Sequence, residues 1–249
     1  RRTIFMGLIV GAPVLIALFL RMLDALGAPV FRVQGATMAG PTIFGLMIWV
    51  FYLRFTVPVL GVFYGTSLIA DEVEDKTITY LFTRPVRRGA VVVGKYIAYL
   101  LCTSLVVLPS VMVVYFLMVP FSQIPGTFIS LLIDLGVLGL GLAAYGALFA
   151  FIGAALKRPL VVGLVFIFGW ELVTLFIPGY LKRFTLAYYL QPLVPHSMPA
   201  GDTVSLLQGA VFREPPSVAA SLSWLAVAII VSLVLAVRVV EQREYILEQ

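Results

Sequence analysis

Charged residues are scarce in this sequence, and several residue types typical of exposed proteins are missing or nearly so. Asp, Glu, Lys and Arg make up 12% of the 249 residues, whereas a soluble domain usually carries about 25%. Asparagine is absent, so there is no N-glycosylation acceptor, and the single cysteine, Cys102, excludes an internal disulfide. The sequence begins at Arg1 and not at methionine, so we expect that some native residues precede it. With 61% hydrophobic residues, the composition is that of a protein embedded in lipid.

Long apolar segments fill most of the chain. A membrane-spanning helix needs about 20 apolar residues, and isolated strands cannot satisfy their backbone polar groups in lipid. Pro120, Pro125 and Gly126 interrupt one uncharged stretch and predict a turn between two spans. We therefore predict an all-α integral membrane protein, one transmembrane domain over residues 1–249, with spans at about 3–20, 41–69, 92–118, 128–156, 160–178 and 216–237.

The positive charges between these spans predict the orientation. If both termini are cytoplasmic, the inner side carries eleven cations: Arg1, Arg2, Lys76, Arg84, Arg87, Arg88, Lys95, Lys157, Arg158, Arg238 and Arg243. The outer side then carries five: Arg21, Arg32, Lys182, Arg183 and Arg213. The positive-inside rule favours this orientation. The same bias accounts for the net charge of +5, so the positive charge is no evidence for binding to nucleic acid, and we expect no nucleic-acid partner.

The longest external loop, residues 179–215, combines three tyrosines and two phenylalanines with several prolines. Aromatic side chains favour the membrane interface. We therefore expect short external or re-entrant helices between the fifth and sixth spans, lying at the outer interface or dipping into it.

The cytoplasmic segment at residues 70–91 is rich in both signs of charge. Its acids, Asp71, Glu72, Glu74 and Asp75, gather where the positive end of a helix dipole would lie, and apolar residues follow farther along. Pro85 should end the helix at the preceding residue. The segment therefore predicts a short amphipathic helix outside the membrane, tied at both ends to spanning helices. A helix resting on the lipid headgroups is the alternative interpretation.

The same segment resembles a known family. An acid, a spacer, a second acid and a later threonine precede Leu-Phe-x-x-Pro-Val-x-Arg, and a Gly-Lys pair begins the next span. This pattern is similar to that of ABC-2 type permeases, the membrane subunits of type-2 ATP-binding-cassette transporters. The matching positions are Glu72, Glu74, Thr77, Leu81, Pro85, Val86, Arg88, Gly94 and Lys95. Lys76 departs from the pattern, because the family often has glycine before the threonine.

The resemblance implies a permease subunit, most often an exporter, that pairs with a second copy of itself or with a similar permease around a substrate pathway. A separate cytoplasmic ATPase would bind ATP and magnesium and dock on the coupling helix. In that scheme Glu72 and Glu74 meet basic groups of the ATPase, and Leu81 and Phe82 fill an apolar cleft. The expected location is a bacterial or archaeal plasma membrane.

Residues 89–96 match the phosphate-binding loop pattern only in part. Gly89 and Gly94-Lys95 satisfy the first seven positions of that pattern, whereas Tyr96 replaces the hydroxyl residue that binds magnesium. The stretch also leads into a span instead of following a core strand. We therefore expect no ATPase site in this chain, and Lys95 to reach toward the headgroups at the cytoplasmic edge.

Three charged residues, Arg54, Asp134 and Glu171, fall inside the predicted spans. A charge at the bilayer centre costs at least about 2.5–3.5 kcal/mol, so these side chains should face protein or water. A structural ion pair is our leading interpretation, and charges that line a pathway or reach to the interface are alternatives. Glycines in the fourth span (Gly136, Gly139, Gly141, Gly146 and Gly153) predict close helix packing.

Two other functional classes remain open at the level of sequence. A membrane-embedded enzyme acting on lipid could use Asp134 and Glu171 as acid and base, although no clustered His, Asp or Glu motif accompanies them. A proton-coupled carrier could use the same charges. Co-purification of an ATPase would distinguish the transporter subunit from both.

Overall fold

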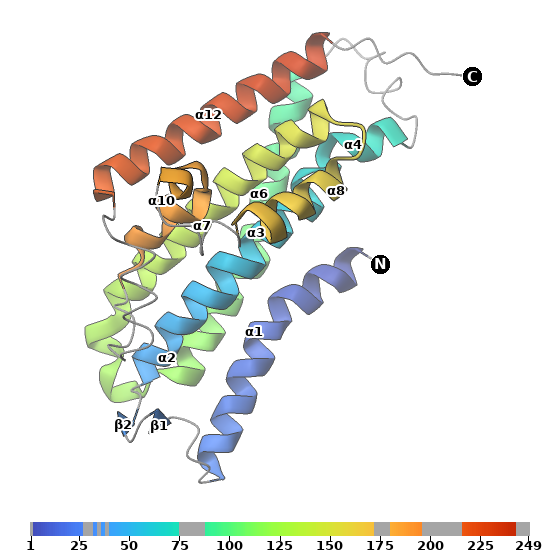
Figure 1. Cartoon of the computed structure of the whole chain (residues 1–249). Helices are drawn as coiled ribbons and strands as arrows, with labels where there is room; N and C mark the ends of the chain where they lie inside the picture. Colours follow the sequence, from blue (N-terminus) through green and yellow to red (C-terminus); the bar gives the residue numbers. More distant parts are fainter. Residues whose placement is uncertain are drawn as a thin grey trace.

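The protein is a bundle of long apolar helices (Figure 1). The computed structural model describes residues 2–26, 32–33, 36–37, 40–74, 88–171, 180–195 and 216–242. Five helices in these ranges are long and apolar enough to cross a membrane, and a sixth apolar helix, Pro159–Glu171, is shorter. The long ones are α1 (Arg2–Ala25), the helix over residues 40–74, α6 (Arg88–Met118), α7 (Ile124–Ala155) and α12 (Val218–Gln242).

Shorter elements occupy the connections. Two strands of two residues each, β1 (Arg32–Val33) and β2 (Ala36–Thr37), pair in antiparallel fashion between the first two helices. The all-α prediction missed this pair. The sixth apolar helix consists of α8 (Pro159–Leu164) and the π-helical stretch η4 (Val165–Glu171). Between it and α12 lie η5 (Tyr180–Phe184), α10 (Leu186–Leu190) and η6 (Gln191–Leu193).

The helix breaks follow proline. α6 ends at Met118, one turn of 3-10 helix (η3, Phe121–Gln123) follows, and α7 begins just before Pro125. Proline fits the first turn of a helix, where no N–H partner is needed. At the other end of α7 the chain leaves the helix at Leu156 and re-enters it at Pro159. α7 and α8 therefore form a tight hairpin, at the break between the predicted spans 128–156 and 160–178.

The helix over residues 40–74 runs through two wider, π-helical stretches. It comprises α2 (Gly40–Met47), η1 (Ile48–Thr56), α3 (Val57–Leu60), η2 (Gly61–Gly65) and α4 (Ser67–Glu74). In η1 the Val57 N–H donates to the Tyr52 carbonyl, five residues back. Pro58 follows, and a proline ring collides with the carbonyl four residues earlier in a regular α-helix. The wider turns let the helix continue through Pro58.

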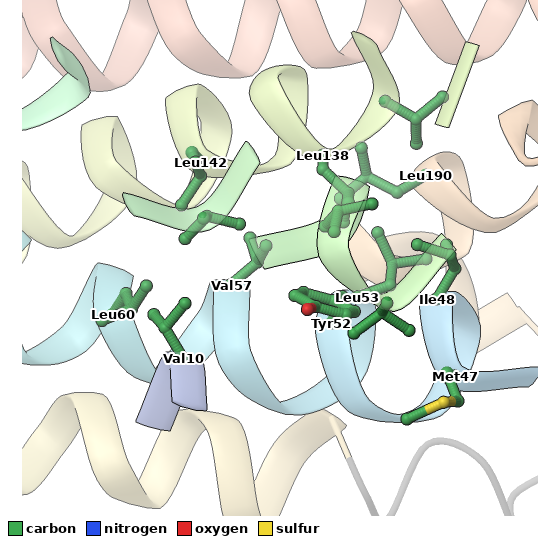
Figure 2. Packing of buried hydrophobic residues seen from close by; sticks show 14 of the residues in the cluster. Val10, Met47, Ile48, Tyr52, Leu53, Val57, Leu60, Leu138, Leu142 and Leu190 are labelled. Atoms are coloured by element: carbon green, nitrogen blue, oxygen red, sulfur yellow. The ribbon is translucent and has the colours of Figure 1, made fainter. Parts of the chain in front are cut away.

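This helix and α7 form the centre of the bundle. In their apolar windows 67% and 56% of residues are buried, against 28% or less in α1, α6 and α12. α12 packs along α7 and α6, and α1 packs along α6, so these helices flank the centre on opposite sides (Figure 1). Figure 2 shows the shared core, in which Leu53 and Val57 meet Leu138 of α7 and Leu190 of α10.

Glycine brings the two central helices into backbone contact. A Cβ added at Gly61 would lie 2.8 Å from Tyr145 Cβ, and one at Gly65 would lie 2.9 Å from Phe149 Cβ. On α7, a Cβ at Gly153 would collide with the Thr66 carbonyl oxygen. The predicted packing role is thus confirmed for Gly153, and for Gly141 and Gly146, which face Val57 and Tyr99. It is wrong for Gly136 and Gly139, where an added Cβ would meet nothing within 4 Å.

Candidate functional site

Most of the predicted ATPase contact lies outside the described residues. Thr77, Leu81, Phe82 and Pro85 fall in the range 75–87 that the structure leaves undescribed. The backbone of Glu72 and Glu74 belongs to the last turn of α4, and Arg88 is the first residue of α6. The acids therefore end the second long helix, and their expected position at the start of a separate helix is wrong. Residues 66–74 contain no proline or glycine that would stop the helix earlier.

The two helices that flank this segment are held together at the ends next to it. A small apolar cluster joins four helices there: α4, α6, α7 and α12. It contains Ile69, Val92, Ala154, Ala236 and Val240. The Lys95 ammonium of α6 also donates a hydrogen bond of 3.1 Å to the Leu68 carbonyl oxygen of α4. Lys95 therefore links the two helix ends that precede and follow the segment. The sequence analysis instead expected its side chain to reach toward the headgroups.

The imitation of a phosphate-binding loop is helical throughout. Residues 88–96 all belong to α6, and Gly89 packs against Val237 of α12. The Tyr96 hydroxyl donates a 2.8 Å hydrogen bond to the Ala143 carbonyl oxygen of α7. A phosphate-binding loop needs free backbone N–H groups in a turn, which a continuous helix does not offer. These residues instead pack α6 against its neighbours.

Two of the three predicted intramembrane charges, Arg54 of η1 and Glu171, lie in one region of the bundle. The side-chain oxygen of Gln191, at the start of η6, accepts hydrogen bonds from Arg54 Nε (2.7 Å) and Nη2, with the amide oriented so that its oxygen faces the guanidinium. On another side the guanidinium carbon lies 5.4 Å from the centre of the Trp49 ring, a cation–π geometry. Arg54 is thus held by one neighbour on its own helix and one from the loop before α12.

Glu171 lies in the same region, at the end of η4. The Tyr145 hydroxyl of α7 donates a hydrogen bond of 2.5 Å to Glu171 Oε1. The backbone of Leu186, at the start of α10, also hydrogen-bonds to this carboxyl group, and Arg54 is near enough to act on it electrostatically. Only 4% of the Glu171 surface is exposed. The predicted intramembrane charges Arg54 and Glu171 therefore share one polar cluster, named the buried polar cluster below. Tyr145, Glu171 and Gln191 are its buried members, and Trp49 and Arg54 are half-buried.

Asp134 belongs elsewhere. It is fully buried on α7, eleven residues before Tyr145, which corresponds to about 16 Å along the helix. Because Tyr145 touches Glu171, the two carboxyl groups stand too far apart to serve one reacting atom as acid and base. The described residues also contain no group of three His, Cys, Asp or Glu that could hold a metal ion.

Sequence reasoning missed three members of the buried cluster: Trp49, Tyr145 and Gln191. Tyr145 stands in the glycine-rich span and was overlooked because aromatic residues are common in spans. Gln191 offered a usable signal, since a glutamine between Leu190 and Pro192 is a polar group in an apolar neighbourhood. Residues 190 and 191 are in fact buried.

The helices and this buried cluster define a multi-pass membrane protein. Residues 5–240, nearly the whole chain, match the family described as ABC-2 family transporter protein. The chain therefore belongs to the ABC-2 transporter family and is a permease subunit of an ABC transporter. No curated protein matches it.

Proposed function

We propose that this chain is the membrane subunit of an ATP-driven exporter that works as a dimer with a separate cytoplasmic ATPase. The ATPase binds ATP and magnesium and docks on residues 70–91, and both termini of the permease face the cytoplasm of a bacterial or archaeal cell. Membership of the ABC-2 family supports the partnership with an ATPase. The excess of positive charge on one side supports the orientation.

The observation that carries the proposal is the joint anchoring of α4 and α6. Both helices contribute to the small apolar cluster that they share with α7 and α12, through Ile69 and Val92, and the Lys95 side chain hydrogen-bonds from α6 to the end of α4. A displacement of the segment between them acts on all four helices at once, because packed interiors transmit strain. An ATPase that moves during ATP hydrolysis thereby has a mechanical connection to the membrane bundle.

The contact itself combines acids with apolar side chains. Glu72 and Glu74 at the end of α4 supply negative charge for basic groups of the ATPase, and Arg88 begins the helix on the other side of the segment. Leu81 and Phe82 supply the apolar part, and Thr77 and Pro85 belong to the same docking segment. Buried aromatic anchors carry much of the free energy of protein interfaces.

The test is a double substitution, Glu72→Ala with Phe82→Ala. The tagged permease is purified from its native membranes, and the ABC ATPase that co-purifies is quantified. We expect loss of most bound ATPase, because truncating a docked aromatic side chain costs on the order of 2 kcal/mol. The melting temperature of the permease in detergent should remain within about 2 °C of the native value, because the proposed contact serves the ATPase and not the membrane fold.

The control is Glu241→Ala with Phe121→Ala. It removes one acid from α12 and one phenylalanine, 84% exposed, from the turn between α6 and α7. This variant should retain the ATPase. Unchanged ATPase binding by the Glu72 and Phe82 variant would overturn the assignment of the docking segment, as would unfolding of that variant with normal binding by the protein that survives.

A further inference from the structure

The loop that precedes α12 reaches the middle of the bundle. Leu190, at the end of α10, lies 3.4 Å from the position of a Cβ at Gly141, seventeen residues into α7. This position is about 25 Å from the outer end of α7 and about 21 Å from its inner end. Ala187 and Leu190 are almost completely buried. α10 is therefore a re-entrant helix, packed at mid-depth against α7 and α12 (Figure 1).

A helix this short needs polar partners at such a depth. Its first backbone N–H groups have no acceptor within the helix, and lipid supplies none. The Leu186 backbone N–H pairs with the Glu171 carboxyl group, and the Ala187 backbone N–H pairs with the Tyr145 hydroxyl oxygen. That hydroxyl donates its own hydrogen to Glu171. One acid and one tyrosine thus satisfy the start of α10.

The end of α10 is held by a different pair. Gln191 directly follows Leu190 and accepts two hydrogen bonds from Arg54. α10 is consequently fixed at its start by helices α7 and η4, and at its end by η1 of the second long helix. Tyr189 adds an aromatic contact with Trp224 of α12, with ring centres 6.1 Å apart.

We propose that Arg54, Tyr145, Glu171 and Gln191 form a polar latch that positions α10 at mid-depth and thereby keeps water from the buried side of α10. The latch deepens the proposed function, because an ATP-driven exporter must keep its pathway sealed while no substrate passes. Its residues position α10 and are not assigned any contact with substrate.

The chemistry of the latch favours a positioning role over simple stabilisation. Burying charged groups costs free energy that their attraction returns only in part, and apolar substitutes of similar volume are often equally stable. A buried polar group does, however, accept few alternative arrangements, because each one leaves a partner unsatisfied. Four polar side chains from separate segments therefore hold α10 in one place.

The experiment measures water access to α10. Ala187→Cys in a Cys102→Ala background places a thiol at a position that is 1% exposed. The full-length protein, in membranes and with its ATPase, is treated from outside with a membrane-impermeant maleimide, without substrate. We expect almost no labelling. Adding Gln191→Leu should raise the labelling rate about tenfold or more, because a hydrogen bond to a charged group is lost.

Matched variants separate the latch from a general loss of structure. Gln191→Glu keeps an acceptor for Arg54 and should keep position 187 protected. Tyr145→Phe removes one oxygen atom but keeps the ring beside Phe149, and should raise labelling as Gln191→Leu does. Phe184→Cys, at a residue that is 72% exposed, should label equally in every background.

Two results would overturn the proposal. One is continued protection of position 187 in folded Gln191→Leu and Tyr145→Phe proteins. The other is equal labelling of Gln191→Glu and Gln191→Leu, which would show that the hydrogen bond to Arg54 is irrelevant. ATPase co-purification is measured on the same samples and should stay normal. Absence of co-purified ATPase from the protein with a native latch would count against the proposed function. The labelling of position 187 tests the latch separately.

Discussion

The second long helix, residues 40–74, and the last one, α12, differ in a way that apolarity does not explain. In the apolar window of the second helix 67% of residues are buried within the chain, whereas in α12 the share is 11%. Yet the buried helix contains Arg54 and Pro58, and the exposed one is an almost unbroken apolar run. The less apolar helix thus occupies the centre, and the more apolar one the periphery.

The difference teaches that small and polar residues select the interior of this bundle. Lipid tails are as apolar as leucine, so burying another leucine between helices gains little, while close packing and hydrogen bonds do favour association. The second helix supplies Gly61 and Gly65 for backbone contact with α7, and Arg54 for the polar latch. α12 instead presents exposed leucine, isoleucine, valine and tryptophan side chains along its length.

Adding one methyl group at the contact between the central helices should have the largest effect. Gly153→Ala drives a Cβ into the Thr66 backbone carbonyl, which cannot move aside as a flexible side chain would. Overpacking of this kind costs about 3 kcal/mol. The melting temperature in detergent should fall by about 6–12 °C.

Gly136→Ala on the same helix is the matched control for this substitution. An added Cβ there meets nothing within 4 Å, so the melting temperature should not fall. Equal effects of the two substitutions would mean that the centre of the bundle is not set by glycine contacts.

The sequence predicts much of the helix pattern because proline and charge mark the breaks. Pro120, Pro125 and Pro159 separate helices where expected, and the acidic and Leu-Phe-x-x-Pro motif indicates the family that the comparison confirms. The sequence of an apolar span does not, however, show which face of the helix packs against protein and which faces lipid. Periodicity is weak when lipid and protein interior are equally apolar, so the central position of residues 40–74 could not be predicted.

The buried polar cluster was only partly predictable for a related reason. Arg54 and Glu171 stand out as charges in apolar segments, and a structural ion pair among the three charges Arg54, Asp134 and Glu171 is the leading interpretation from sequence, without named partners. Their hydrogen-bond partners come from α7 and from the loop before α12, far away in sequence. Only the fold brings Tyr145 and Gln191 to them. Asp134 is also a charged residue in an apolar segment, but it is buried at another position on α7, away from this cluster. The sequence does not distinguish it from Arg54 and Glu171.

Removing side-chain volume should also distinguish the two helices, with a smaller effect. Leu53→Ala empties a fully buried site in the core between the second helix and α7. Large-to-small substitutions in soluble cores cost about 2–5 kcal/mol, and in a membrane the transfer part of that cost is largely absent, which leaves about 2 kcal/mol. Chemical denaturation in mixed micelles measures the loss.

Leu222→Ala on α12 is the matched leucine control. This side chain is 47% exposed within the chain, so its removal should change the free energy of unfolding by less than about 0.5 kcal/mol. A loss as large as that of Leu53→Ala would show that this face of α12 is covered by protein.

The smallest expected effect concerns single hydroxyl groups between α6 and α7. Tyr96 donates a 2.8 Å hydrogen bond to the Ala143 carbonyl oxygen, and Tyr99 donates a longer one, 3.3 Å, to the Leu142 carbonyl oxygen. Both carbonyls lie within α7 and also accept from its own backbone, so neither becomes an unsatisfied buried group when the hydroxyl is removed. Tyr96→Phe should therefore cost about 1 kcal/mol, and Tyr99→Phe less, because its bond is longer. The melting temperatures of the two variants should fall by about 2–4 °C and by less than 2 °C. A larger loss for Tyr99→Phe would mean that the longer hydrogen bond contributes more than the shorter one, so that length does not rank the two bonds between α6 and α7.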